Sequence, residues 1–310
     1  MGAVNATGLF DIHCHGAVGS NFGIDEPGSR AARAHHASVG VEAQVASLVT
    51  AARETLRDQV RMLAPLVADG TFAGIHLEGP FLSNARRGAH DPDLLANPDP
   101  GLVELLADAA AEAGAEGAIV QWTLAPELPG AAETLKALAE RGILPALGHS
   151  DAGAHVFADA LAQAAELTGR LPLVTHLYNG MPPLHHRLGG PAAVALGAAA
   201  RGEAIVELIA DGTHVAPEVV RMTFDAVGPD HVVLISDAMA ATGLGDGPYR
   251  LGSLEVTVTD GVARLDSGAI AGSTATLADC LVWAVDVAGV DREMALAAAS
   301  STPARVMQRG

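Results

Sequence analysis

Short apolar runs alternate with longer Ala- and Leu-rich stretches along most of the chain, and this alternation constrains the fold more than any other feature. The apolar runs have the length of buried strands, and the stretches between them have helical spacing. Strands that alternate with helices form parallel sheets, and eight such units predict a closed (β/α)8 barrel of the TIM type, an α/β fold. The expected strands are Leu9–Cys14, Val41–Val49, Phe72–Leu77, Ala118–Leu124, Ile143–Leu147, Leu171–Thr175, Ala204–Ile209 and His231–Ser236.

The segments between these strands are expected to be helices, and an open doubly wound sheet is the alternative arrangement of the same elements. No Gly-x-Gly-x-x-Gly motif follows the first strand, which favours the barrel. Because 49% of the residues are hydrophobic, the chain can bury a large core. The expected helices are Ala52–Ala68, Gly101–Ala113, Ala131–Arg141, Ala154–Leu167, Pro191–Ala200 and Pro217–Val227.

The pattern changes after Asp237. Tyr249–Val258 and Val262–Leu265 flank Thr259-Asp260-Gly261, which predicts a C-terminal β-hairpin with its turn at Asp-Gly. The sequence has no repeat and no linker-like segment, so we expect one barrel domain over residues 1–310. Two helices are expected after the hairpin, at Ala275–Ala288 and Arg292–Ser300.

The net charge and the cysteine content limit which partners the chain can bind and in which compartment it can work. The net charge of -18 argues against nucleic acids and anionic membranes as partners. Cys14 and Cys280 are the two cysteines, so we expect no disulfide framework and a reducing compartment. Residues 1–5 lack the basic and apolar segments of a signal peptide, and charged residues, Gly and Pro interrupt every apolar run. We therefore expect a cytoplasmic protein.

Polar residues follow the ends of six of the eight expected strands. His13 and His15 are two residues apart at the end of the first strand, so both side chains point to one side while Cys14 faces the surrounding helices. In a barrel the carboxyl ends of all strands meet at one face, where active sites lie. The other strand ends contribute Glu78, His149, His176, His214 and Asp237.

This group of residues has the chemistry of a metal centre. Imidazole nitrogens and one carboxylate suit zinc, iron or manganese better than calcium. His13, His15, Glu78, His149 and His176 are more ligands than one catalytic zinc takes, which favours two metals bridged by Glu78. The one lysine, Lys136, lies in an expected helix and is out of reach for a carbamylated bridge.

Asp237 is the best candidate for the group that accepts a proton from a metal-activated water and passes it to a leaving nitrogen. A helix N-cap or a plain metal ligand are its alternative roles. The chemistry predicted from these residues is metal-assisted hydrolysis of an amide or a similar bond.

Several longer motifs resemble those of the N-acetylglucosamine-6-phosphate deacetylase family of the amidohydrolase superfamily. The similarity runs from Gly8 to about Met307. It is carried by His76-Leu77-Glu78-Gly79-Pro80-Phe81-Leu82 with Gly88-Ala89-His90, by Thr175-His176-Leu177-Tyr178-Asn179-Gly180-Met181-Pro182-Pro183-Leu184-His185-His186-Arg187, by Ser236-Asp237-Ala238-Met239, and by Ala271-Gly272-Ser273.

The resemblance implies a role for each of these residues. Glu78, His149 and His176 would hold the main metal, and His13 and His15 a second one that is present in some members. Asp237 would shuttle the proton, and His214 would steady the carbonyl oxygen as charge develops. Arg187 would reach the 6-phosphate from a neighbouring subunit, which implies a homodimer. The sugar and phosphate site would be lined by Ala89, His90, Asn179, Gly180, Ile270, Ala271 and Gly272.

The chain also departs from the family. Members carry a small β-sandwich built from both ends of the chain, and we expect it to be absent here because twelve residues precede His13 and the chain stops at Gly310. Gly180 replaces the more usual Ala, and Ser83-Asn84-Ala85-Arg86-Arg87 departs from the usual Ser-Pro-x-Arg/Lys pattern. Two alternatives therefore stay open. One is an amidohydrolase that acts on another N-acyl or cyclic amide, and the other is a non-catalytic sugar-phosphate sensor.

Overall fold

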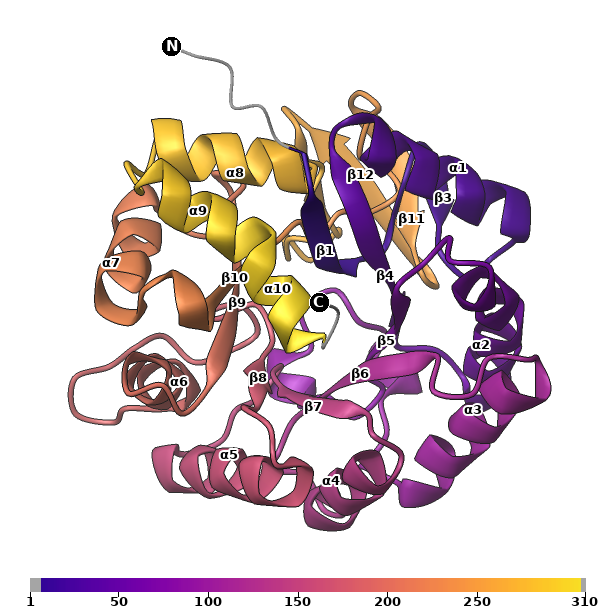
Figure 1. Cartoon of the computed structure of the whole chain (residues 1–310), viewed down its shortest axis with the longest axis horizontal. Coiled ribbons are helices and arrows are strands. Elements are labelled where there is room, and N and C mark those ends of the chain that lie inside the picture. The colour runs from indigo at the N-terminus through magenta and orange to yellow at the C-terminus, as the bar shows by residue number, and fades with distance from the viewer. Residues whose placement is uncertain (1–6, 308–310) are drawn as a thin grey trace.

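In the computed structural model, which describes residues 7–307, eight parallel strands follow one another around a single sheet in chain order (Figure 1). This order confirms the predicted (β/α)8 barrel and excludes a doubly wound sheet, whose strand order would reverse. The ends of the sheet meet where the Asp237 N–H donates to His13 O over 3.0 Å. The strands are β1 (Leu9–Cys14), β4 (Val41–Val49), β5 (Gly74–Glu78), β6 (Ile119–Leu124), β7 (Leu144–Leu147), β8 (Leu173–Val174), β9 (Ile205–Ile209) and β10 (Val232–Ile235).

Helices cover the outside of the barrel, and every expected helix is present. Two further helices, α1 and α10, escaped prediction. α1 buries only Ser29, Ala32 and His36, so its sequence lacks an apolar stripe. The helices are α1 (Glu26–Ser38), α2 (Arg53–Ala68), α3 (Pro100–Glu112), α4 (Ala131–Glu140), α5 (Ala154–Thr168), α6 (Pro191–Ala200), α7 (Pro217–Val227), α8 (Leu277–Asp286), α9 (Arg292–Ala299) and α10 (Ser301–Val306), with short 3-10 turns η1 (Asn84–Arg86), η2 (Pro92–Leu94) and η3 (Pro229–His231).

Two apolar cores lie on either side of the barrel wall. The larger core fills the space between strands and helices, and the smaller one fills the barrel interior. Strand β9 shows the division, because Ile205 and Ile209 belong to the interior core whereas Val206 and Leu208 belong to the outer one. This alternation turns Glu207 into the barrel, where it is fully buried.

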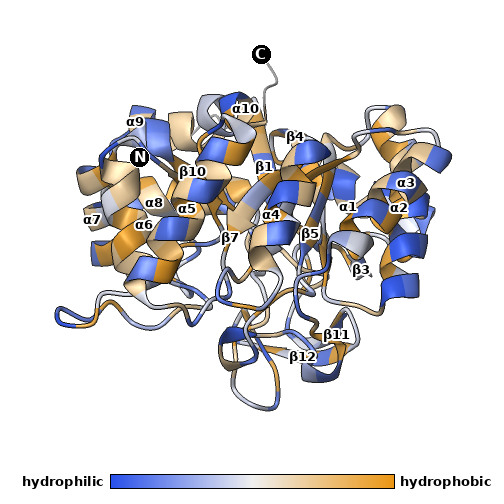
Figure 2. Ribbon diagram, turned by 90° about the horizontal axis from the view of Figure 1, so that it is seen from below, coloured by the Kyte–Doolittle hydropathy of each residue, from blue (hydrophilic) through white to orange (hydrophobic). Residues whose placement is uncertain are grey.

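A small antiparallel sheet stands at one end of the barrel, opposite α10 (Figure 2). The predicted hairpin is wrong in one respect, since Tyr249–Val258 is two strands separated by a turn at Gly252, whose φ is +57°. The predicted turn at Asp260 and Gly261 is confirmed, with positive φ at both residues, as a tight hairpin requires. The strands are β11 (Gly247–Leu251), β12 (Leu254–Thr259) and β13 (Val262–Arg264), and a two-stranded ribbon is formed by β2 (Gly16–Ala17) and β3 (Ser20–Asn21).

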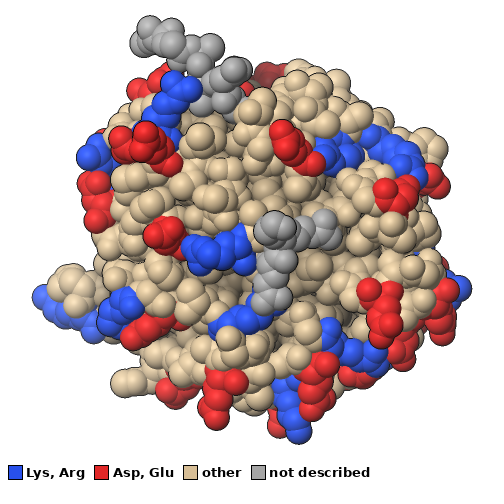
Figure 3. All heavy atoms as spheres, in the orientation of Figure 1, with Lys and Arg blue, Asp and Glu red and all other residues tan. Residues whose placement is uncertain are grey.

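Arginines and acidic residues are interspersed on the face that carries α10 (Figure 3). Among the described residues, several exposed arginines form ion pairs, such as Arg30 with Asp69 at 2.7 Å. Within residues 7–307, no helix combines the length and hydrophobicity needed to cross a bilayer. The prediction that no signal peptide is present concerns residues 1–5, which lie outside the described residues. The two ends of the domain expected over residues 1–310 also lie outside them.

Candidate active site

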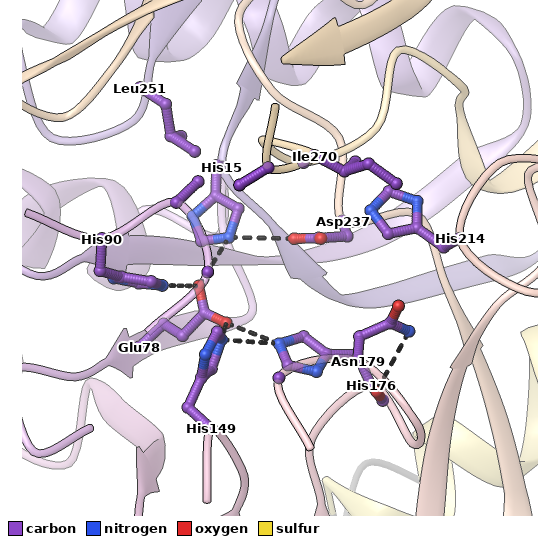
Figure 4. A pocket seen from close by; sticks show the side chains of 15 residues that line it. His15, Glu78, His90, His149, His176, Asn179, His214, Asp237, Leu251 and Ile270 are labelled. Atoms are coloured by element: carbon purple, nitrogen blue, oxygen red, sulfur yellow. Dashed lines mark hydrogen bonds and ion pairs between the residues drawn. The ribbon is translucent and has the colours of Figure 1, made fainter. Parts of the chain in front are cut away.

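A cavity of about 220 Å³ opens at the carboxyl ends of the barrel strands, beside the small sheet (Figure 4). Leu251 of β11 lies at its edge, so the small sheet forms part of the pocket wall. Most residues predicted for the site meet here, although they come from distant parts of the chain. The lining residues are His15, Glu78, Gly88, Ala89, His90, His149, His176, Asn179, Gly180, His214, Asp237, Leu251, Ala269, Ile270 and Gly272.

Glu78, the last residue of β5, occupies the centre of the histidine cluster (Figure 4). Its Oε1 lies 2.9 Å from His176 Nε2 and 3.0 Å from His149 Nε2. Its Oε2 lies 3.2 Å from His15 Nε2 and 3.4 Å from His90 Nε2. Oε1 also lies 3.6 Å from His13 Nε2. The Glu78 carboxylate therefore reaches both pairs of histidines, His13 with His15 and His149 with His176, as a bridging ligand requires.

The second nitrogens of the rings fix the tautomers and test whether a cation fits. His149 Nδ1 lies 2.7 Å from the Arg86 carbonyl oxygen, which can only accept, so the ring proton is on Nδ1. In a neutral ring, His149 Nε2 then presents a lone pair to Glu78 Oε1. Two acceptors at 3.0 Å repel one another unless a positive charge lies with them.

The same pattern recurs at the end of β1. His13 Nδ1 faces a carboxylate oxygen of Glu207 at 3.0 Å, and His15 Nδ1 faces the Ser47 carbonyl oxygen at 3.3 Å. If both rings are neutral, both Nε2 atoms are acceptors, yet they lie 3.3 Å apart. Opposed lone pairs of nitrogen and carboxylate oxygen fit a divalent cation of the zinc, iron or manganese class.

In the absence of a metal, protons on the imidazoles meet the same demand for positive charge. Burial lowers the pKa of His15, but Asp237 and Glu78 outweigh it and raise that pKa to about 9. Burial likewise opposes ionisation of Glu78, but the neighbouring imidazoles bring its pKa well below the usual range. A cation bound among these groups would replace the protons.

A bulge in β1 aims both histidines of the His-x-His motif into the site. Phe10 and Ile12 point into the barrel core, so strict alternation would turn His13 outward. The pairing with β4 shifts between Asp11 and Cys14, where β1 has one extra residue. His13 and His15 thereby reach the cluster, and Cys14 faces α1, with its sulfur 3.3 Å from His36 Nε2.

Three candidate site residues hold a left-handed backbone. His149, His176 and Asp237 have φ of 47°, 26° and 51°, and each comes two residues after the end of its strand. Such conformations are costly for residues other than glycine and gather at functional sites. Gly180, with φ +59°, packs against the cluster so closely that a Cβ would lie 2.8 Å from His149 Nδ1.

Asp237 and His214 lie on the side of the pocket opposite His149 (Figure 4). Asp237 Oδ1 is 3.2 Å from His15 Nε2. His214 Nδ1 donates to Asp211 Oδ2 over 2.8 Å. Burial lowers the pKa of His214, but the bond to Asp211 and its charge outweigh burial and raise that pKa. The raised pKa favours the imidazolium, whose Nε2–H can donate to an oxygen in the pocket.

Other predicted residues lie outside the pocket. Ala271 is buried in the core of the small sheet, although its neighbours Ile270 and Gly272 line the cavity. Arg187 is exposed on the loop that precedes α6, where its backbone N–H donates to His185 Nδ1. Lys136 pairs with Glu140 on the surface of α4 at 3.8 Å, far from any bridging position.

Two carboxylates that support the site were missed by the sequence reasoning. Glu207 contacts His13, and Asp211 contacts His214. The signal for Glu207 was a single acidic residue inside an otherwise apolar strand. The signal for Asp211 was its spacing of three residues from His214, which lets it bond both the ring and the backbone N–H of that histidine.

The chain resembles known proteins over nearly its whole length, although no family model matches it. It is 35% identical to the N-acetylglucosamine-6-phosphate deacetylases of Vibrio furnissii and Homo sapiens, over 87% and 99% of its own length. It spans 65% of the Vibrio protein and 75% of the human one. A solved structure of the Mycobacterium smegmatis N-acetyl-D-glucosamine-6-phosphate deacetylase, in complex with N-acetyl-D-glucosamine-6-phosphate, superposes with a TM-score of 0.90 at 40% identity, covering 98% of this chain and 77% of that one.

Proposed function

Because the chain belongs to the N-acetylglucosamine-6-phosphate deacetylase family of the amidohydrolase superfamily, we propose that it hydrolyses the acetamide of N-acetylglucosamine 6-phosphate or of a close N-acetyl amino sugar phosphate. The observation that carries the proposal is the cluster around Glu78, in which imidazole and carboxylate acceptors oppose one another at 2.9–3.4 Å. Such a cluster suits a hydrolytic cation.

Glu78, His149 and His176 would hold the main cation, and His13 and His15 a second one, with Glu78 between them. Zinc is the proposed metal, and iron and manganese suit the same ligands. When bound, such a cation polarises the amide carbonyl and makes water acidic enough to attack it near neutral pH.

The protein's own groups would move the proton and balance the charge. Asp237 accepts a proton from the attacking water and returns it to the leaving nitrogen. His214, held by Asp211, donates a hydrogen bond to the carbonyl oxygen as negative charge builds there. Asp237 is only 8% exposed, so the proton stays between protein and substrate.

The sugar would lie against Ala89, His90, Asn179 and Gly180, with Ile270 and Gly272 also in the pocket lining. Arg187 would bind the 6-phosphate of a substrate in the partner subunit of a homodimer, since its guanidinium lies outside its own pocket. A bidentate arginine contact matches the geometry of phosphate. We propose a cytoplasmic setting, in keeping with two free, buried cysteines.

Acetate release tests this proposal. The purified protein is assayed with N-acetylglucosamine 6-phosphate and with the unphosphorylated sugar, and its metal content is measured alongside. We expect acetate from the phosphorylated sugar, loss of activity on chelation, and recovery with Zn²⁺. Release of acid from a different N-acyl or cyclic amide alone would favour another amidohydrolase. Binding of the sugar phosphate with metal present and no turnover would favour the sensor.

A further inference from the structure

Glu207 is a fully buried carboxylate in the middle of strand β9, inside the barrel. Its Oε2 accepts hydrogen bonds from His13 Nδ1 over 3.0 Å and from the backbone N–H of His176 over 3.1 Å. Its Oε1 accepts from Gln121 Nε2 over 2.7 Å. The Glu207 side chain thus links its own strand, β9, to His13 in β1 and to Gln121 in β6, and it also holds the backbone of His176.

A charge in this position needs a reason. An unpaired buried carboxylate is costly, and an apolar side chain of equal volume usually fits a barrel interior as well or better. Its neighbours in the same strand, Ile205 and Ile209, also point into the barrel and are apolar, so Glu207 is the one acidic residue on the inner face of β9. Glu207 accepts hydrogen bonds from two residues of the candidate metal centre, His13 and His176. We infer that a carboxylate is present at this buried position because the metal centre needs these bonds.

The contact to His13 has a specific chemical effect. By accepting from Nδ1–H, the carboxylate fixes the tautomer that leaves Nε2 free as a ligand, and it makes that nitrogen more basic. The hydrogen bond from the His176 N–H to Glu207 stabilises the left-handed backbone of His176, a proposed ligand of the main cation. Glu207 therefore links the two halves of the cluster.

We propose that Glu207 is a positioning residue whose carboxylate holds His13 in the orientation that a second divalent cation needs at the His13–His15 subsite. This inference rests on the proposed function, because it assumes that the cluster binds metal. Glu207 would contact neither the substrate nor a cation, but it would determine whether the chain binds one cation or two.

The substitution Glu207→Gln isolates the charge. Its amide oxygen can still accept from His13 and His176, and its amide nitrogen then faces Gln121. The side-chain oxygen of Gln121 has no partner among the described residues, so that amide can turn and accept. The variant keeps the shape and the hydrogen bonds and loses only the negative charge.

The test is a titration of the metal-free chain with Zn²⁺ alone, with bound metal counted per chain at buffered free Zn²⁺. For Glu207→Gln we expect the affinity for the second equivalent to fall about tenfold to hundredfold, and the first equivalent to change much less. Asp11→Asn is the matched control. Asp11 is also a fully buried carboxylate next to His13, but it accepts from the Ser236 hydroxyl and from the backbone N–H groups of Ser236 and His13, and it forms no hydrogen bond with the His13 ring. It therefore separates loss of a nearby buried charge from loss of the bond to the ring.

If Glu207→Gln fails to fold, as judged by its thermal transition, Gln121→Leu supplies the second variant. It frees one oxygen of Glu207 and should weaken the second equivalent by a smaller factor. Three results would overturn the inference: an unchanged second equivalent in the folded variants, parallel losses in Asp11→Asn, or a wild-type chain that takes up a single Zn²⁺. Failure of the proposed function looks different, because the wild type would then bind zinc without releasing acetate, or bind none.

Discussion

The two ends of the candidate substrate site are built in opposite ways. At one end, four buried histidines each lie within 3.4 Å of a carboxylate oxygen of Glu78, namely His15, His90, His149 and His176. On the loop before α6, Leu188 is 77% exposed. Among the described residues, the guanidinium of Arg187 forms no hydrogen bond or ion pair.

This contrast suggests that the cluster around Glu78 carries out the reaction and that the loop with Arg187 recognises the substrate. The candidate metal cluster is formed by residues of one chain, and hydrogen bonds within that chain orient the rings of His13, His15 and His149. The guanidinium of Arg187, which would contact the phosphate, is exposed to solvent. An exposed ion pair contributes little free energy unless it is shielded from water. We therefore expect substitutions in the cluster to change turnover, and substitutions on the loop to change apparent substrate affinity.

The largest effect is expected for Asp237→Asn. An amide has nearly the same shape as the carboxylate but accepts no proton, so kcat should fall about a hundredfold to ten-thousandfold with little change in KM. Steady-state kinetics and metal content measured on the same preparation check this. A variant that loses the main metal as well would show that Asp237 is chiefly a ligand.

A smaller effect, confined to phosphorylated substrates, is expected for Arg187→Ala. Loss of a charge-assisted contact to phosphate should raise KM for N-acetylglucosamine 6-phosphate about tenfold to hundredfold. Turnover of the unphosphorylated sugar, measured in parallel, serves as the internal control and should not change. Equal effects on both sugars, or none on either, would remove Arg187 from the phosphate site.

The smallest effect is expected for Cys14→Ala, although this residue stands between two candidate ligands. The thiol faces His36 of α1, and burial raises its pKa well above the usual range, so it stays protonated and is a poor ligand. We expect unchanged metal content and a loss of about 1 kcal/mol in the free energy of unfolding. Metal analysis and thermal denaturation check this, and loss of bound metal would contradict it.

Much of the barrel was predictable because its signals are local. The bounds of β1, β4, α6 and α7 agree with the expected ranges, since apolar periodicity and a proline at the start of α6 and α7 mark them. The ligand candidates were found because polar residues at strand ends are conspicuous in an apolar sequence.

Other features depend on pairings that no local pattern reveals. The bulge in β1 arises from the register of that strand against β4, thirty residues away in the chain. The turn at Gly252 divides a run in which apolar and polar residues alternate on both sides, so the pattern alone does not mark the break. Glu207 could be placed only once the barrel had closed and His13 was seen to lie beside it.

The claim that one chain supplies the chemistry and its partner the phosphate contact is tested most directly by mixing two variants that are each impaired at low substrate concentration. Glu78→Gln lacks the central ligand but keeps Arg187, and Arg187→Ala keeps the cluster. In randomly assorted homodimers, about a quarter of all sites combine an intact cluster with an arginine from the partner subunit. We predict that co-expressed subunits recover about that fraction of wild-type activity on N-acetylglucosamine 6-phosphate at low substrate concentration. Activity no greater than the sum of the separate variants would contradict the account.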